Sequence, residues 1–150
     1  MEFNEYLRES HPDHPGWHEW RIADETRFNG GVLGTVLVRP EGDDQARVRI
    51  FPTRLHTNLA DNVHGGIILS LMDIALFAGS TVATGRDMKF GVTVELNSHF
   101  VGAGDPTRPL DAVVEVVRET GRMIFVRGTV VQEEDIVASF SGILRKIARA

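Results

Sequence analysis

The sequence contains the stretch Gly66-Ile-Ile-Leu-Ser-Leu-Met-Asp-Ile-Ala-Leu-Phe-Ala-Gly-Ser-Thr-Val-Ala83, an apolar run in which Asp73 is the only charged residue. It predicts a core helix over 66–83 that is buried nearly all round, and Gly85 is typical of the position just after a helix end. An ionised carboxylate in an apolar helix is unfavourable unless it is paired or hydrogen-bonded. We therefore expect the protein to use Asp73, either in its chemistry or as a buried structural carboxylate that neighbouring donors satisfy.

A polar, glycine-rich segment leads into this helix and reads Asn58-Leu-Ala-Asp-Asn-Val-His64-Gly65-Gly66. The first N–H groups of a helix have no partner within it and lie at its positive end. Gly65 and Gly66 would let a ligand oxygen approach these groups, as in a site for a developing oxyanion; alternatively, they only permit close packing. His64 could be a general base, a hydrogen-bond donor to a substrate or a local cap. Asn58 could hold a water or a carbonyl, or stabilise the loop.

Asp73 and the helix start are too far apart to act together within one chain. Asp73 follows Gly65 by eight residues, which is ~12 Å along a helix axis. A catalytic base must lie within hydrogen-bond reach of the group on which it acts. Either the two features are unrelated, or a second subunit brings its Asp73 to this helix start, and a two-fold dimer would then hold two equivalent composite sites.

Strand-like patterns fill most of the remaining chain. The expected strands are Gly34–Arg39, Ala46–Phe51, about 92–100, Leu110–Glu119, Met123–Glu133 and Ile136–Lys146. We expect the segment Pro40–Gln45 to join the first two strands as a rather long loop, and a short helix to lie near Asn4–Glu9. This order predicts an α+β architecture, with a sheet of about six antiparallel strands on one buried helix.

In the third of these strands, apolar and polar residues alternate. The apolar positions are Val92, Val94, Leu96 and Phe100, and the polar positions are Thr93, Glu95, Asn97 and His99. If the apolar face lies on the helix, Thr93 points away from Asp73, unless a strand end or a bulge re-aims it.

The composition fits one domain with a sizeable core. The chain has 150 residues, 42% of them hydrophobic and 25% charged, as in ordinary globular proteins. A formal net charge of −5 argues against non-specific nucleic-acid binding. The absence of cysteine excludes disulfides, thiolate catalysis and thiolate zinc sites. The N-terminus does not read as a signal peptide, and we expect a cytoplasmic protein without a membrane partner.

The motifs together resemble the hotdog-fold thioesterase superfamily, in particular its PaaI-like (phenylacetic-acid-type) branch. That branch carries an Asn, five residues, His-Gly-Gly, and an Asp nine residues after the His; here these are Asn58, His64-Gly65-Gly66 and Asp73. The family's Gly-x-Ser/Thr corresponds to Gly91-Val-Thr93, and Arg118-Glu-Thr-Gly-Arg122 resembles its strand–turn–strand step. The order of elements agrees over about residues 30–147.

The resemblance implies a hotdog fold, a six-stranded antiparallel sheet wrapped around one long helix, and an acyl-CoA thioesterase. The Gly65 N–H would polarise the thioester carbonyl, assisted by Gly66, and Asp73 of the facing subunit would attack it or activate water. Asn58 and Thr93 would position the water or the carboxylate, and His64 would support the thioester end. A homodimer or a dimer of dimers is implied, with no metal and no cofactor. The acyl group, aromatic or of short or medium length, is not specified.

Cationic side chains that follow the helix are candidates for binding the phosphates of CoA. They are Arg86, Lys89, Arg118, Arg122 and Arg127, of which we favour Arg122, together with Arg118 and Lys89. Alternatively, they form an ordinary solvated strand surface.

The N-terminal 28 residues are expected to form a lid or packing segment that precedes a single domain at 29–150. This segment holds Trp17 and Trp20, which could border an acyl pocket. It also holds a group of possible metal ligands, His11, Asp13, His14 and His18. Their spacing matches no closed zinc site, and the intervening prolines and glycine disfavour a helical presentation, so we expect no metal.

Two other functions fit the same fold. A hotdog hydratase or dehydratase pairs a His with an acidic residue, in one family within an Asn-Pro-x-His step. Here the corresponding stretch is Asn62-Val-His64, which lacks the proline. A non-catalytic acyl-CoA binding protein should lack an attacking carboxylate, and the presence of Asp73 argues against it.

Overall fold

The computed structural model describes residues 10–21, 24–88 and 90–147. The elements in chain order are β1 (His18–Glu19), the short π-helical segment η1 (Asn29–Leu33), β2 (Val36–Gly42), β3 (Gln45–Ile50), the 3₁₀ turn η2 (Arg54–His56), α2 (Gly65–Thr84), β4 (Val92–Phe100), β5 (Leu110–Glu119), β6 (Met123–Gln132) and β7 (Asp135–Arg145). The short helix expected at Asn4–Glu9 lies outside the described residues.

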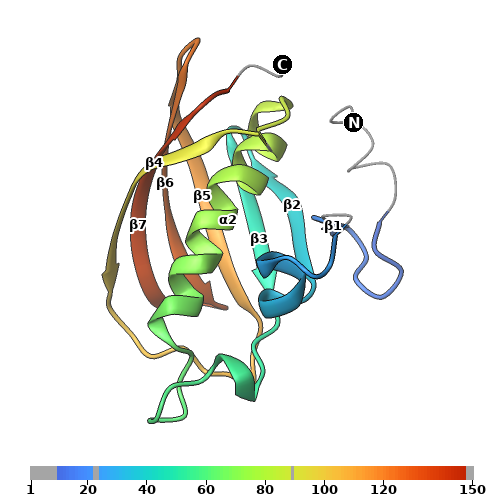
Figure 1. Ribbon diagram of the computed structural model, residues 1–150, viewed down its shortest axis with the longest axis vertical. Helices are drawn as coiled ribbons and strands as arrows, with labels where there is room; N and C mark the ends of the chain where they lie inside the picture. The colour runs from blue at the N-terminus through green and yellow to red at the C-terminus, as the bar shows by residue number, and fades with distance from the viewer. Residues whose placement is uncertain (1–9, 22–23, 89, 148–150) are drawn as a thin grey trace.

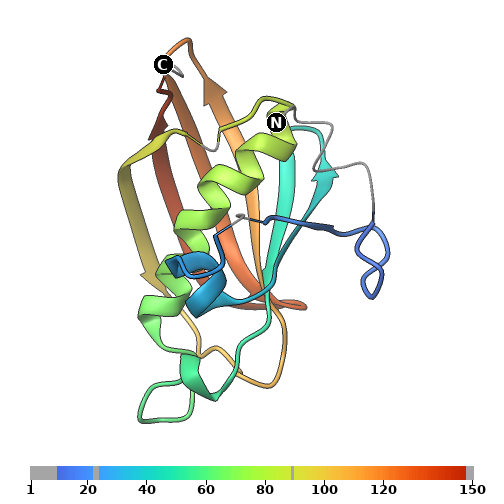
Figure 2. The same cartoon turned by 45° about the vertical axis from the view of Figure 1, so that its right-hand side comes forward.

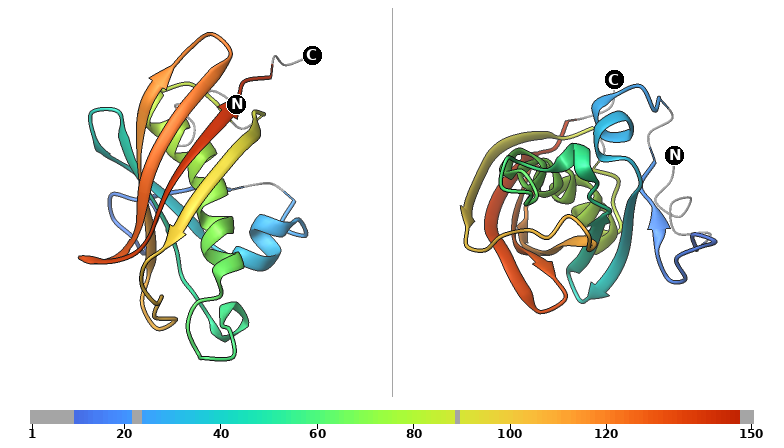
Figure 3. Two further views of the ribbon diagram at one scale, coloured as in Figure 1. Left: turned by 90° about the vertical axis from the view of Figure 1, so that its left-hand side faces the viewer. Right: turned by 90° about the horizontal axis from the view of Figure 1, so that it is seen from below.

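The strands form one antiparallel sheet in the order β1-β2-β3-β5-β6-β7-β4. The sheet curves around α2, which lies along its concave side (Figure 1; Figure 3, right). The predicted α+β architecture is confirmed, and the seventh strand is the two-residue β1 at one edge. The opposite edge is β4, a strand of nine residues.

The hairpin between β2 and β3 is tighter than predicted. The expected loop Pro40–Gln45 is mostly strand, because β2 continues to Gly42 and β3 begins at Gln45. Asp44 has a φ of 57° in the remaining turn, a left-handed conformation that Asp adopts more readily than most residues. The prediction was therefore wrong about where the strands end.

The central helix buries most of its circumference, but not all of it. Its fully buried side chains include Leu71, Met72 and Leu76, which pack against the sheet in one hydrophobic core. A stripe at helical spacing remains uncovered and consists of Gly66, Leu69, Ser70, Asp73 and Phe77. The expectation of burial nearly all round is thus wrong for the single chain. By length and composition α2 could also cross a membrane, which is weak evidence because core helices pass the same test.

The N-terminal segment is attached to the sheet on two sides. Trp20 belongs to the hydrophobic core, and η1 lies beside the lower half of α2 (Figure 2). Trp17 is buried between the guanidinium groups of Arg39 and Arg49, each 4.5 Å from its ring, which is a favourable cation–π arrangement. The segment therefore contributes to packing at both tryptophans.

Close packing of α2 on β5 depends on Gly79. A Cβ placed there would lie 2.2 Å from a methyl group of Val114, which is far inside van der Waals contact. We expect Gly79→Ala to lower the free energy of unfolding by about 1–3 kcal/mol despite the better helix propensity of alanine. Thermal or urea unfolding measures the effect.

The matched control for this prediction is Gly121→Ala, since a Cβ at Gly121 meets nothing within 4 Å. Adding Val114→Ala to Gly79→Ala should recover part of the loss, because it removes the clashing methyl group. A double variant whose loss equals the sum of the two single losses would contradict this explanation.

Candidate functional site

The start of α2 is capped by the side chain of His64. His64 has extended backbone angles, and its Nδ1 accepts a hydrogen bond of 2.8 Å from the Gly66 N–H. A backbone N–H can only donate, so Nδ1 carries no proton, and a neutral His64 has its proton on Nε2. In this conformation His64 is a cap with an Nε2–H available to donate. It is not a general base, because its basic nitrogen is occupied.

The two glycines that follow His64 have different reasons to be glycine. A Cβ at Gly66 would lie 3.0 Å from His64 Nδ1, so the cap itself requires the small residue. A Cβ at Gly65 would lie 3.6 Å from the Phe100 ring, which is ordinary contact. Packing within one chain therefore explains Gly66 and leaves Gly65 unexplained. The Gly66 N–H, expected to assist in binding substrate, is occupied by His64, whereas no hydrogen bond in the described chain occupies the Gly65 N–H.

Asp73 is held by one hydroxyl group. The Oγ1–H of Thr93 donates to Asp73 Oδ1 at 2.6 Å, a short charge-assisted hydrogen bond. Asp73 is half-buried and forms no ion pair with any residue that the structure describes. A carboxylate offers about four acceptor positions, so most of its capacity is left facing the uncovered stripe of α2. It does not match a fully buried, fully satisfied structural carboxylate.

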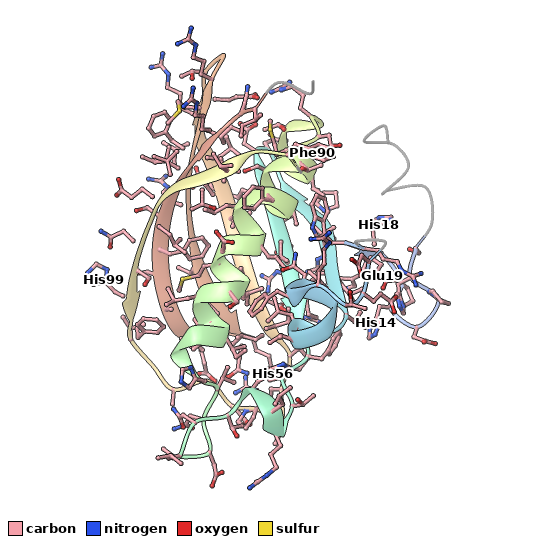
Figure 4. The ribbon with its side chains drawn as sticks, in the orientation of Figure 1. His14, His18, Glu19, His56, Phe90 and His99 are labelled. Carbon is pink, nitrogen blue, oxygen red and sulfur yellow. The ribbon has the colours of Figure 1, made fainter. Side chains whose placement is uncertain are left out.

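A β-bulge brings Thr93 to Asp73. In the pairing of β4 with β7, Thr93 faces Leu144 and Glu95 faces Ile143, so Val94 is the extra residue. The bulge shifts the alternation by one position, and Thr93 therefore shares the helix side with Leu96, which packs on the core. His99 points away from α2 (Figure 4). Strict alternation assigned Thr93 to the wrong face.

The loop before α2 forms an open groove around Asn58. Asn58 Oδ1 accepts hydrogen bonds from the N–H groups of Ala60 and Asn62, at 3.0 and 3.1 Å, so it stabilises the loop. Its amide N–H₂ forms no hydrogen bond with the described residues. The groove has a volume of about 830 Å³, and both Asn58 and His64 line it. The structure thus brings these two candidates together, and it adds Arg54, which the sequence did not single out.

Within one chain, the candidate residues form two separate groups. Gly65 lies against Phe100, at the end of β4, and Asp73 bonds Thr93, at its start. The groups are ~12 Å apart along α2, as the sequence spacing predicted. The chain alone therefore does not bring Asp73 to the Gly65 N–H.

The candidate cations separate into two faces of the sheet. Arg122 lines a groove of about 430 Å³ near the C-terminal end of α2, together with Arg86, Arg145 and Lys146. Arg118 pairs with Phe125 beyond a bulge at Val117, which directs it to the face opposite α2. Arg127 lies on that opposite face as well, in an ion pair with Glu115. Lys89 lies outside the described residues. The sequence analysis did not name Arg145 and Lys146 as candidate phosphate ligands, because basic residues at a strand end usually form ordinary solvated surface.

The groove of Arg122 carries more positive than negative charge. Glu119 binds both Arg86 and Lys146, so one carboxylate faces two cations. Partial burial, and then the positive charge of Arg86, lower the pKa of Lys146 from its ordinary value. Arg122 and Arg145 are exposed, and neither forms an ion pair with a described residue.

The N-terminal histidines have a structural setting. The rings of His11 and His14 lie 5.0 Å apart, and His14 also stacks near Phe51. Among the described residues, no group of three or more His, Asp or Glu side chains could hold a metal ion. The buried His56 beneath η1 (Figure 4) accepts from the Thr53 N–H and donates to the Val32 carbonyl, so it fastens two loops together.

Comparisons with known proteins identify the family and the fold. A family model described as the Thioesterase superfamily matches residues 60–139, which include Asp73, the helix start and β4 to β6. The chain belongs to the thioesterase superfamily. The search of curated proteins gave no match to this chain.

Solved structures of the hotdog fold resemble this chain in shape. PaaI from the phenylacetic acid degradation operon of E. coli has 22% identity and a TM-score of 0.68, covering 83% of this chain and 87% of that one. Protein PA5202 from Pseudomonas aeruginosa has 24% identity and a TM-score of 0.64, with coverages of 84% and 100%. Thioesterase superfamily member 2 from Mus musculus has 17% identity and a TM-score of 0.64, with coverages of 81% and 90%. The predicted hotdog thioesterase fold is confirmed.

The cap at the start of α2 can be tested through stability. Asparagine can accept the same backbone hydrogen bond, whereas alanine cannot. We expect His64→Ala to lower the free energy of unfolding by about 0.5–2 kcal/mol and His64→Asn to lose less. Urea unfolding of the two variants compares them, and equal losses would show that the Nδ1 hydrogen bond does not stabilise the fold.

Proposed function

We propose that this protein is an acyl-CoA thioesterase that acts as a homodimer. Each of its two sites combines Asp73 of one chain with the helix start of the other. The observation that carries the proposal is the carboxylate of Asp73, fixed by Thr93 on the uncovered stripe of α2 without a cation to neutralise it. Three features of the chain support the composite arrangement.

The first feature is the free edge of β4. This strand ends the sheet, and it crosses in front of α2 with no element beyond it (Figure 3, left). Its exposed apolar side chains include Val92, Val94 and Phe100. The unpaired backbone groups of a nine-residue edge strand invite pairing with another chain, and pairing with a second copy about a two-fold axis extends the sheet.

The second feature is the direction of β4 relative to α2. Thr93, at the start of the strand, bonds Asp73, and Phe100, at its end, contacts the position of Gly65. Antiparallel pairing of two β4 strands, centred near Leu96, sets the start of each strand opposite the end of the other. Asp73 of one chain then comes next to Gly65 of its partner.

The third feature is the state of the helix start. The Gly65 N–H lies at the positive end of α2 and has no hydrogen-bond partner among the described residues. A Cβ added at Gly65 would make only an ordinary contact with the Phe100 ring. His64, the preceding residue, accepts from Gly66 through Nδ1 and so keeps its Nε2–H as a further donor. An unpaired backbone N–H with a neighbouring imidazole N–H suits a carbonyl oxygen that gains negative charge during attack.

These residues account for thioester hydrolysis as follows. The Gly65 N–H polarises the thioester carbonyl, with His64 Nε2–H as a second donor. Asp73 of the facing chain attacks the carbonyl carbon, or removes a proton from the water that attacks it. Thr93 fixes the orientation of the carboxylate, and the free amide of Asn58 holds the water. Collapse of the tetrahedral species breaks the C–S bond and releases the CoA thiolate, which takes up a proton. If water attacked, the free acid forms in this step; if Asp73 attacked, water then hydrolyses the mixed anhydride and regenerates the carboxylate.

The uncovered stripe of α2 offers surface for the acyl group. Leu69, which is 37% exposed, and the half-buried Phe77 flank Asp73 along the helix. An aromatic, short-chain or medium-chain acyl group fits such a surface. A dimer of dimers, a cytoplasmic location, and the absence of cofactor, metal, nucleic-acid and membrane partners stay predictions.

Replacement of Asp73 tests the mechanism directly. Asp73→Asn keeps the shape and an acceptor for Thr93 but removes the base or nucleophile. We expect kcat for acyl-CoA hydrolysis to fall by at least about 100-fold, with the oligomer unchanged. A thiol-release assay with a panel of acyl-CoAs and a mass measurement in solution give the result. Asp43→Asn, in the exposed β2–β3 turn, is the matched control. Full activity of Asp73→Asn would refute the mechanism.

Complementation between chains tests the composite site. Gly65→Ala should also be inactive, because its Cβ covers the N–H, while its contact with Phe100 stays ordinary. A mixed dimer of one Asp73→Asn chain and one Gly65→Ala chain contains one intact composite site. We expect it to show about half the activity of the unmutated dimer. If each site were formed by one chain, the mixed dimer would be as inactive as its parents.

A further inference from the structure

A groove at the C-terminal end of α2 has the charge and position of an anion-binding site. This groove, named the basic groove here, has a volume of about 430 Å³, and its lining includes Arg86, Met88, Gly91, Arg122, Arg145 and Lys146. The helix end supplies negative partial charge, so an anion would bind only if side chains more than offset it. Whether an anion binds in the basic groove therefore depends on how many cationic side chains line it and on how many of them are already in ion pairs.

Cations exceed carboxylates in the basic groove. Arg86 and Lys146 compete for Glu119, whose side chain is 16% exposed. Asp87 is the acidic residue in the lining itself. Arg122, in the β5–β6 turn, and Arg145, at the end of β7, lie side by side, because Arg145 pairs with Met123 and the Lys146 N–H donates to the Arg122 carbonyl. Neither arginine forms an ion pair with a described residue. Two neighbouring arginines without an ion-pair partner are well suited to phosphate oxygens.

The basic groove lies directly beyond the Asp73–Thr93 pair. Arg145 pairs with Val92, and Leu144, which lines the groove, pairs with Thr93. Gly91 in the groove wall is two residues from Thr93 in sequence. A ligand whose reacting group lies at Asp73 can thus continue along β4 into the groove without leaving the chain.

The length of CoA matches this path. From sulfur to the pantoyl oxygen, the pantetheine arm has about twelve bonds, as many as four extended residues, or roughly 14 Å. From Asp73 to the end of α2 at Thr84 is eleven residues, or ~16 Å of helix. The partner's basic groove lies at the far end of the partner's α2, ~30 Å from the partner's Gly65. The arm reaches only the nearer groove.

We infer that the basic groove of each chain binds the phosphates of the acyl-CoA whose thioester meets Asp73 of that same chain. The inference rests on the proposed acyl-CoA activity. It assigns Arg122 and Arg145 as the principal phosphate contacts, with Arg86 and Lys146 as the supporting cations. It also predicts that the chain donating Asp73, and not the chain donating Gly65, recognises the nucleotide end of the substrate.

Binding of CoA without turnover is the primary test. We expect Arg122→Ala/Arg145→Ala to weaken CoA binding at least about tenfold, which corresponds to 1.4 kcal/mol, and to leave pantetheine binding unchanged, because pantetheine has no phosphates. Isothermal titration calorimetry measures both. Arg122→Lys/Arg145→Lys keeps the charges and should recover much of the affinity.

The matched control is Arg21→Ala/Arg27→Ala, which removes the same charge from two exposed arginines, 64% and 73% accessible, in the N-terminal segment. It should leave CoA affinity unchanged. An unchanged CoA affinity in the groove variant, or an equal loss in the control, would overturn the assignment.

Kinetics separate this inference from the proposed activity. The groove variant should raise KM for acyl-CoA with kcat preserved, and it should not change KM for the corresponding acyl-pantetheine. Equal effects on both substrates would contradict a phosphate site. If the unmutated protein hydrolyses no acyl-CoA, the proposed activity is wrong. The calorimetry with CoA then still shows whether the basic groove binds the phosphates.

A mixed dimer decides which chain supplies the groove. One chain carries Asp73→Asn, and the other carries Arg122→Ala/Arg145→Ala. The only site with an intact Asp73 then has the neutralised groove beside it, so we expect the raised KM. A KM equal to that of the unmutated dimer would place the phosphates on the opposite chain and overturn the inference.

Discussion

A carboxylate on a core helix is tolerated only where a donor satisfies it, and this constraint organises the structure around Asp73. Hydrogen bonding to Thr93 meets part of the requirement and leaves the rest open to solvent or a ligand. Thr93 reaches Asp73 only because of the bulge at Val94. The bulge in turn fixes how the edge strand β4 lies against α2. The same contact that stabilises the charge therefore also sets the edge at which a second chain would pair.

Much of the fold could be predicted from the sequence, because its elements have strong local patterns. The apolar run around Asp73 can only be a buried helix in a domain of this size, and the alternation of the later strands is regular. The helix boundaries and the last four strands accordingly lie close to the predicted ones. The two-residue strand β1 carries no such signal, since its pairing with β2 depends on the burial of the neighbouring Trp17 and Trp20.

The sequence indicated which residues belong to the candidate site, but it indicated less about how they are arranged in space. Spacing alone indicated that Asp73 and Gly65 lie apart in one chain. The bulge that re-aims Thr93 has no signature in the alternation, which reads equally well without it. The Nδ1 cap of His64 depends on a side-chain rotamer, and the basic groove depends on β7 ending beside the β5–β6 turn. These are tertiary relations, so a pattern along the chain does not contain them.

The polarity of α2 assigns different tasks to its two ends. At the N-terminal end, the backbone itself provides positive partial charge, so a glycine without a side chain is enough to bind a carbonyl oxygen that becomes negative. At the C-terminal end, the backbone repels anions, and phosphates require side-chain cations in excess, as Arg122 and Arg145 provide. In the proposed dimer, antiparallel pairing of two β4 strands would set the positive start of one α2 near the middle of the other, where Asp73 lies. The order of an acyl-CoA along this path, with the thioester between the two chains and the phosphates on one of them, then follows from helix polarity and strand direction together.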